Sequence, residues 1–152
     1  KKDINLTEFY ELTRSEGFGK EVKRRVMLGT FVLSAGYYDA YFTRAQKVRQ
    51  LLCDKTQDVF KNYDFIIMPT SPATAFTIGE KMDDPIAMYL ADIYTVMANL
   101  VGVPAISLPL FKHSNGMPFG LQVIANRFDE LPLLQISHQL MNTSFAEVNG
   151  HS

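Results

Sequence analysis

Three charged residues stand in apolar surroundings, where an uncompensated charge is costly: Arg24, Arg25 and Asp92. The two arginines run directly into the segment VMLGTFVLSAGYY, and Asp92 is the only acid in the helical pattern MYLADIYTVMANLVG. A buried carboxylate needs a cationic partner, a hydrogen-bond network or a ligand. These residue types indicate recognition of charged groups. A structural salt bridge at the arginines, and a helix start or local bend at Asp92, are the alternatives.

Arg25 is the arginine predicted to face inward. Adjacent positions on an α-helix lie about 100° apart, so only one of two neighbouring arginines can readily join the apolar side. Val22, Val26 and Gly29 define that side through spacings of four and three. Arg25 lies next to them on the helical wheel, and Arg24 lies further round.

The sequence contains no self-sufficient set of catalytic groups. A nucleophile needs a base within reach, and there is neither a Gly-x-Ser-x-Gly turn nor a histidine beside a plausible nucleophile. His138 is interpreted as a surface or packing histidine. The pair Asp83–Asp84 is interpreted as a helix cap rather than a metal site. Gly17 and Gly19 lack the strand and the Lys-Ser/Thr of a phosphate-binding loop.

The composition is that of ordinary globular material. The chain has 152 residues, of which 47% are hydrophobic and 20% charged, and its formal net charge is -1. That charge gives no support for a free-standing binder of nucleic acid or of a membrane surface. The single cysteine, Cys53, excludes an internal disulfide framework and a cysteine-based zinc site and favours a reducing, cytoplasmic setting. No apolar run approaches the roughly 18 residues of a membrane span.

Periodicity and turn residues predict helices alternating with three short strands. The strands are expected at 64–68, 105–110 and 119–125, and the turn KHSNGMP joins the last two into a hairpin. The helices are expected at about 5–14, 20–33, 37–61, from Asp83 or Asp84 to about 100, and 129–141, followed by a polar tail at about 142–152.

This order predicts an α/β fold with a mixed β-sheet flanked by helices. Three strands alone would form a thin sheet with exposed edges. We therefore expect them to complete a larger sheet whose other strands lie upstream. The chain also opens at Lys1 with a helical pattern almost at once, which favours a piece of a longer polypeptide.

Four stretches of the chain resemble the C-terminal third of the amidase-signature family. They are GFGKEVKRRVMLGTFVLSAGYYDAY, FIIMPTSPATAF, MYLADIYTVMANLVGVPAISLPL and NGMPFGLQVIA, in family order and at family spacing. The string GTxxLSxGYYDAY is similar to the amidotransferase branch, whereas NLxGxPAISxP and PxGLQ are shared across the superfamily. The resemblance covers residues 5–141 approximately and implies that residues 1–152 are a C-terminal segment of an amidase domain.

The resemblance implies a glutaminase subunit of a tRNA-dependent amidotransferase, which releases ammonia from glutamine for transamidation of mischarged aspartyl- or glutamyl-tRNA(Asn/Gln). The family's Ser-cis-Ser-Lys triad and Gly/Ser-rich loop would lie upstream, so this segment has no expected catalytic residue and is expected to be inactive alone. It would instead supply substrate-binding residues. By position these are Arg25 for the α-carboxylate of glutamine and Asp92 for its α-ammonium.

The same resemblance implies partners and cofactors. A B subunit would carry out the ATP-dependent activation and bind tRNA, and a small C subunit would stabilise the interface between the subunits. The upstream part of the same polypeptide would complete the amidase domain. We expect this segment to bind no cofactor or metal and to contact neither tRNA nor a membrane, while the whole complex uses ATP and Mg. The alternatives are a stand-alone amidase of small amides, which would need neither charge, and a non-catalytic binding or scaffold fragment.

Overall fold

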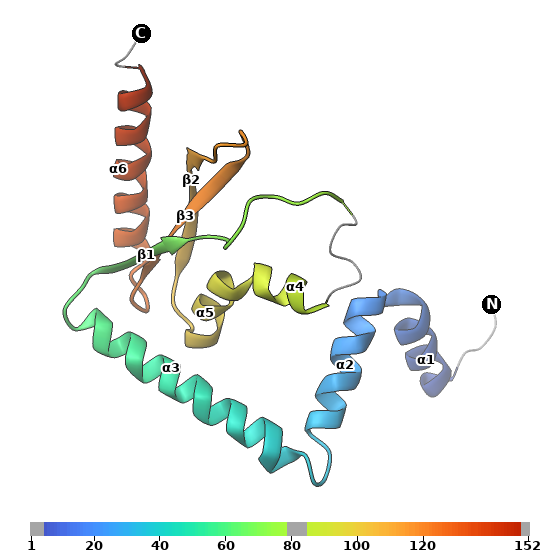
Figure 1. The fold of residues 1–152 in the computed structure, drawn as a ribbon. Coiled ribbons are helices and arrows are strands. Elements are labelled where there is room, and N and C mark those ends of the chain that lie inside the picture. The colour runs from blue at the N-terminus through green and yellow to red at the C-terminus, as the bar shows by residue number, and fades with distance from the viewer. Residues whose placement is uncertain (1–4, 79–84, 150–152) are drawn as a thin grey trace. The chain divides into compact units, whose positions relative to one another are not determined.

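A computed structural model describes residues 5–78 and 85–149, and the chain divides into two compact units, 1–48 and 49–152. The predicted cap at Asp83 or Asp84 lies outside the described residues. The relative placement of the units is not determined, so each is described by itself (Figure 1).

The first unit is helical. It holds α1 (Leu6–Gly17), α2 (Lys20–Val32) and a π-helical turn, η1 (Tyr38–Thr43), which leads into α3 (Arg44–Phe60). The Asn5 side chain caps α1 by accepting a hydrogen bond of 2.9 Å from the Glu8 backbone N–H, a role that asparagine commonly fills at helix N-termini. The predicted single helix over 37–61 is divided, because its first turn is π-helical.

The second unit is built around a small sheet. Its elements are β1 (Phe65–Pro69), α4 (Pro85–Ala91), α5 (Ile93–Val101), β2 (Ala105–Lys112), β3 (Pro118–Ala125) and α6 (Glu130–Asn149). The strand order is β1-β3-β2, and both pairs are antiparallel. The α/β class is confirmed, but the three described strands contain no parallel pair of the kind a mixed sheet requires.

Local chemistry accounts for the strand pairing. The predicted hairpin turn is present, with Gly116 at φ 80° and the His113 backbone N–H donating to the carbonyl of Met117. A tight turn can join only antiparallel neighbours. The last helix continues to Asn149 instead of ending near Met141, so the predicted polar tail is helical as far as the structure describes it.

Helices cover both faces of the sheet (Figure 1). Alternating strand residues divide between two clusters, as a period of two requires. On one face Ile124 and residues of β1 pack with α5 and the later part of α3. On the other face Val123 and Ala125 pack with α6. Residues 70–76 of the loop after β1, and Leu90 and Ala91 at the end of α4, lie beside Ser107 and Gly120 of the sheet.

Among the residues that the structure describes, no helix combines the length and apolar character needed to cross a membrane.

Candidate functional site

The two adjacent arginines of α2 share one carboxylate. Arg24 Nη2 lies 3.1 Å from Glu21 Oε2, and Arg25 Nε lies 3.1 Å from Glu21 Oε1. The spacings of three and four residues bring these groups together on the helix surface. The ion pair that the sequence left open for the arginines is therefore present.

Neither arginine is buried by the described residues. The side chain of Arg25 is 66% exposed and that of Arg24 is 51% exposed, and neither α1 nor α2 has a buried residue. The predicted inward orientation of Arg25 is thus not seen, because Val22, Val26 and Gly29, which define that side of α2, are themselves exposed among the described residues. Exposed ion pairs contribute only about 0–1 kcal/mol to stability, so the pair with Glu21 leaves Arg25 able to exchange partners.

Asp92 interrupts what the sequence predicted to be one helix. It lies between α4 and α5 with φ -99° and ψ 4°, in a sparsely populated backbone region where turn residues and many active-site residues are found. Its backbone N–H donates to the carbonyl of Tyr89, and its own carbonyl accepts from the Val96 N–H. The local bend anticipated for this position is therefore real.

The carboxylate of Asp92 is exposed at this break. It stands at the N-cap of α5 but makes no side-chain capping hydrogen bond. Within the described parts of the chain no side chain pairs with it, and the Thr95 hydroxyl bonds instead to the Asp92 backbone carbonyl at 3.0 Å. The side chain is thus an accessible anion.

Arg25 and Asp92 belong to different units. Because the relative placement of the two units is not determined, their joint role in binding glutamine stays a prediction.

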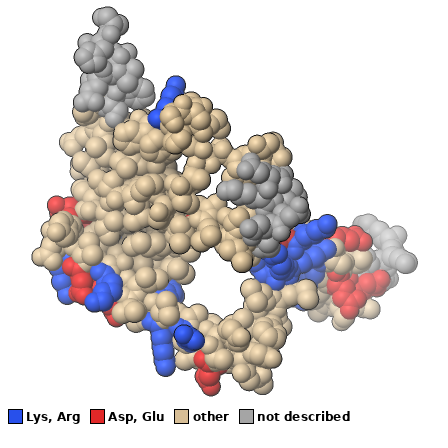
Figure 2. Space-filling model, in the orientation of Figure 1, with Lys and Arg blue, Asp and Glu red and all other residues tan. Residues whose placement is uncertain are grey.

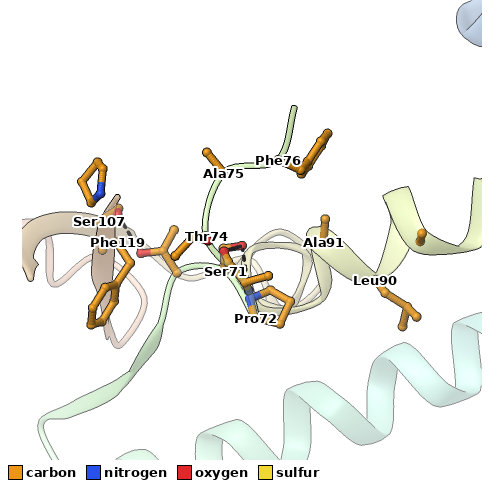
Figure 3. Close-up of a pocket in the computed structure, with 14 residues that line it drawn as sticks. Ser71, Pro72, Thr74, Ala75, Phe76, Leu90, Ala91, Ser107 and Phe119 are labelled. Atoms are coloured by element: carbon orange, nitrogen blue, oxygen red, sulfur yellow. Dashed lines mark hydrogen bonds between the residues drawn. The ribbon is translucent and has the colours of Figure 1, made fainter. Parts of the chain in front are cut away.

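A pocket of about 500 Å³ opens beside the α4–α5 junction, wholly within the second unit. Its walls are the loop after β1, the inner side of α4, and the adjoining parts of β2 and β3. Figure 3 shows Ser107 and Phe119 at one end and Leu90 and Ala91 at the other. Ala91 directly precedes Asp92. The lining residues that the structure describes are mostly small or apolar, include four hydroxyl groups and carry no charge: Thr70, Ser71, Pro72, Ala73, Thr74, Ala75, Phe76, Ala87, Leu90, Ala91, Ser107, Pro118, Phe119 and Gly120.

Two of these hydroxyls meet across a strand. Thr70 Oγ1 and Ser107 Oγ are 2.6 Å apart, and either can be the donor. Thr70 follows β1 and Ser107 belongs to β2, with β3 running between them. The Thr70 backbone N–H donates to the carbonyl of Gly120 at 2.9 Å, which extends the β1–β3 pairing and fixes the beginning of the loop.

His138 and the acidic residues considered for a metal site were the other candidates from the sequence. His138 lies on α6 within 3.0 Å of the Asn142 side chain. The described residues contain no group of three or more His, Cys, Asp or Glu placed to hold a metal. An exposed ion pair that the sequence analysis did not single out joins Asp58, near the end of α3, to Lys61 just after it; the hydrogen bond from Lys61 lowers the pKa of Asp58 and raises that of Lys61.

The pocket was missed in the sequence. The stretch TSPATAF was interpreted only as a loop, and AISLPL only as a buried strand. The available signal was Ser107, a hydroxyl within a mostly apolar strand, because such a side chain can hydrogen-bond another hydroxyl across the sheet; in the structure Ser107 is exposed. Its partner is 37 residues away in sequence, and no local pattern identifies such a pair.

Comparison with known proteins defines the class of this one. The family model described as Amidase matches residues 1–134. The chain belongs to the amidase family.

Two of its relatives carry the same name. The chain is 57% identical over 134 residues to the A subunit of glutamyl-tRNA(Gln) amidotransferase of Bacillus thuringiensis (strain Al Hakam), covering 88% of this chain and 28% of the relative. The crystal structure of the A subunit of glutamyl-tRNA(Gln) amidotransferase from Thermotoga maritima is 54% identical with a TM-score of 0.58, covering 81% of this chain and 27% of that one. This chain therefore spans somewhat more than a quarter of the length of these relatives.

A more distant structure shares the fold alone. The S177A variant of Kluyveromyces lactis allophanate hydrolase is 20% identical, with a TM-score of 0.65 over 91% of this chain and 23% of that one.

Proposed function

We propose that this chain is the C-terminal segment of a glutaminase subunit of a tRNA-dependent amidotransferase and that it recognises the amino-acid part of glutamine. The observation that carries the proposal is Asp92, an exposed carboxylate at a helix break and beside a pocket of about 500 Å³. Pockets for small ligands have volumes of about 300–1,000 Å³. The names of the relatives that share more than half of their aligned residues with it support the choice of substrate.

Charge complementarity gives each residue a role. Free glutamine carries an α-ammonium and an α-carboxylate. Asp92 would accept hydrogen bonds from the ammonium, and Arg25 would bind the carboxylate with its planar guanidinium, exchanging Glu21 for the substrate. Holding both charged groups on the α-carbon would orient the side-chain amide toward the catalytic groups.

Acyl transfer itself would take place on residues outside this segment. A serine would attack the side-chain amide of glutamine, the C–N bond would break with release of ammonia, and water would hydrolyse the acyl-enzyme to glutamate. The segment would act through substrate position rather than through bond breaking.

The remaining parts of the proposal concern the whole protein. We propose a cytoplasmic complex in which B and C subunits supply tRNA binding and ATP-dependent activation with Mg. The segment itself would bind neither a cofactor nor tRNA.

The test is substitution of Arg25 and Asp92 in the whole protein with its partner subunits. Arg25→Ala and Asp92→Ala should each lower kcat/KM for glutamine about ten- to a hundredfold, since each removes a charge-assisted contact worth about 1.5–3 kcal/mol. Arg25→Lys should restore only part of the loss, because an ammonium cannot reproduce the planar fork. Glutamine-dependent kinetics and thermal melting are measured for every variant.

Arg24→Ala is the matched control. It removes a neighbouring guanidinium that binds the same Glu21, and its effect on glutamine use should be much smaller. Losses at Arg25 and Asp92 that merely follow lost stability would make both residues structural ions. A larger loss at Arg24 would instead assign the carboxylate to the other arginine.

A further inference from the structure

Gly120 is a glycine because of space, not because of its backbone conformation. Its φ lies outside the left-handed region that favours glycine, unlike those of Gly102 and Gly116. A Cβ at position 120 would lie 2.8 Å from Thr70 Oγ1 and would overlap with Ser107 Oγ. The missing side chain is what allows the two hydroxyls to meet over β3.

The pair has one proton left for a ligand. Two hydroxyl groups hold two protons, and the bond between them uses one. Among the described residues, the hydroxyls of Thr70 and Ser107 hydrogen-bond only to each other, at 2.6 Å. Both residues line the pocket. The pair can therefore donate one hydrogen bond into the pocket and accept others there.

The rest of the pocket selects for an uncharged group. Among the lining residues that the structure describes there is no Lys, Arg, Asp, Glu or His, and most of them are Ala, Pro, Leu and Phe. Burying a charge against such a wall without a partner would be costly, whereas a neutral carbonyl or carboxamide needs only hydrogen bonds. The accessible charge nearest in sequence, Asp92, lies outside the lining and directly after Ala91.

We propose that the Thr70–Ser107 hydroxyl pair, held together over Gly120, is a specificity-determining element that hydrogen-bonds the uncharged amide-bearing part of the substrate. This inference rests on the proposed function and extends it. Asp92 would bind the ammonium at the edge of the pocket, and the hydroxyl pair would bind the neutral portion within it.

The experiment uses the whole protein with its partner subunits and compares two amide donors. Glutamine must occupy the pocket, whereas ammonium supplied directly replaces the product of the glutamine site. The variants are Thr70→Val, Ser107→Ala and the double variant, which removes the pair completely. The control is Thr143→Val on α6, whose exposed hydroxyl bonds to the carbonyl of Gln139 at 2.9 Å.

The double variant should lower kcat/KM for glutamine about five- to tenfold, mainly through KM, as expected for loss of a neutral hydrogen bond to substrate. Each single variant should have a smaller effect, because the remaining hydroxyl keeps its proton. The ammonium-dependent reaction should stay within about twofold of the unaltered protein. Thr143→Val should change neither reaction.

Two outcomes would overturn the inference. If both reactions and the melting temperature fall together, the hydroxyl pair only supports the sheet and other parts of the protein fill the pocket. If the double variant keeps its KM for glutamine, the pair does not touch substrate.

A failure of the proposed function looks different. The unaltered complex would then hydrolyse other small amides without using glutamine. In that case the KM for the accepted amide decides the role of the pair, since it rises in the double variant only if the pair binds the amide.

Discussion

Single residues in this chain act through charge and volume over a few ångströms. Glu21 holds two exposed guanidinium groups at 3.1 Å each, an arrangement that contributes little to stability. Asp92 is exposed without capping the helix that it begins. The guanidinium groups of Arg24 and Arg25 and the carboxylate of Asp92 therefore stay accessible to solvent.

The volume of Gly120 gives a prediction at the same scale. Gly120→Ala should lower the free energy of unfolding by about 1–3 kcal/mol through overpacking, because its Cβ would press on the two hydroxyls. The cost should be smaller in a Ser107→Ala background, where the overlapping oxygen is absent. Urea titrations of the four proteins of this double-mutant cycle measure the coupling. Strictly additive costs would mean that position 120 and the Ser107 hydroxyl do not compete for space.

Whole elements are held by contacts that their own sequences do not contain. The last carbonyls of an α-helix lack partners within it. In α5 the carbonyl of Leu100 accepts from Arg49 Nε at 2.7 Å, and that of Val101 accepts from Arg127 Nη2 at 2.8 Å. Cationic donors at a helix C-terminus also interact favourably with the helix dipole. These two arginines fix the end of the helix that begins at Asp92.

Arg127→Met should therefore destabilise the second unit. Its aliphatic part is kept, but the charged hydrogen bond to Val101 is lost, which should lower the free energy of unfolding by about 1.5–3 kcal/mol. Arg44→Met, at an exposed position of α3, is the matched control and should remain within about 0.5 kcal/mol. Urea unfolding of the whole protein measures both. Equal stability of the two variants would show that Arg127 does not support α5.

At the scale of the molecule, much apolar surface stays uncovered. Phe9 and Met27 are 56% and 73% exposed on helices that bury nothing. On the face drawn in Figure 2, uncharged atoms predominate over the strands and α6. In the described sheet β1 and β2 are both edges. Large exposed apolar areas and unpaired strand edges are typical of surfaces that bind other polypeptide segments.

The isolated segment 1–152 should consequently dimerise, aggregate or melt early. Its strand edges would pair with those of other copies, and its apolar helices would associate. Light scattering after size-exclusion chromatography measures the first effect, and thermal melting measures the second. A monodisperse monomer with a high, cooperative transition would show that the segment is stable without further chain.

The sequence by itself determined the kinds and order of the elements. Periodicity over a few residues identified α2, the three strands and the hairpin, because each depends on local backbone preference and on which side chains alternate. It also identified the charges at Arg25 and Asp92, since a charge in an apolar pattern is visible without a fold. The motifs of the chain resembled the amidase family, to which it belongs.

Tertiary structure decided what depends on distant partners. The pair Thr70–Ser107 and the space at Gly120 arise where β1, β2, β3 and α4 converge. Contacts between residues 37 or 51 positions apart leave no periodic trace, because any hydroxyl or arginine in a suitable place can make them. Local chemistry thus specified the elements, whereas the pocket formed only when they packed together.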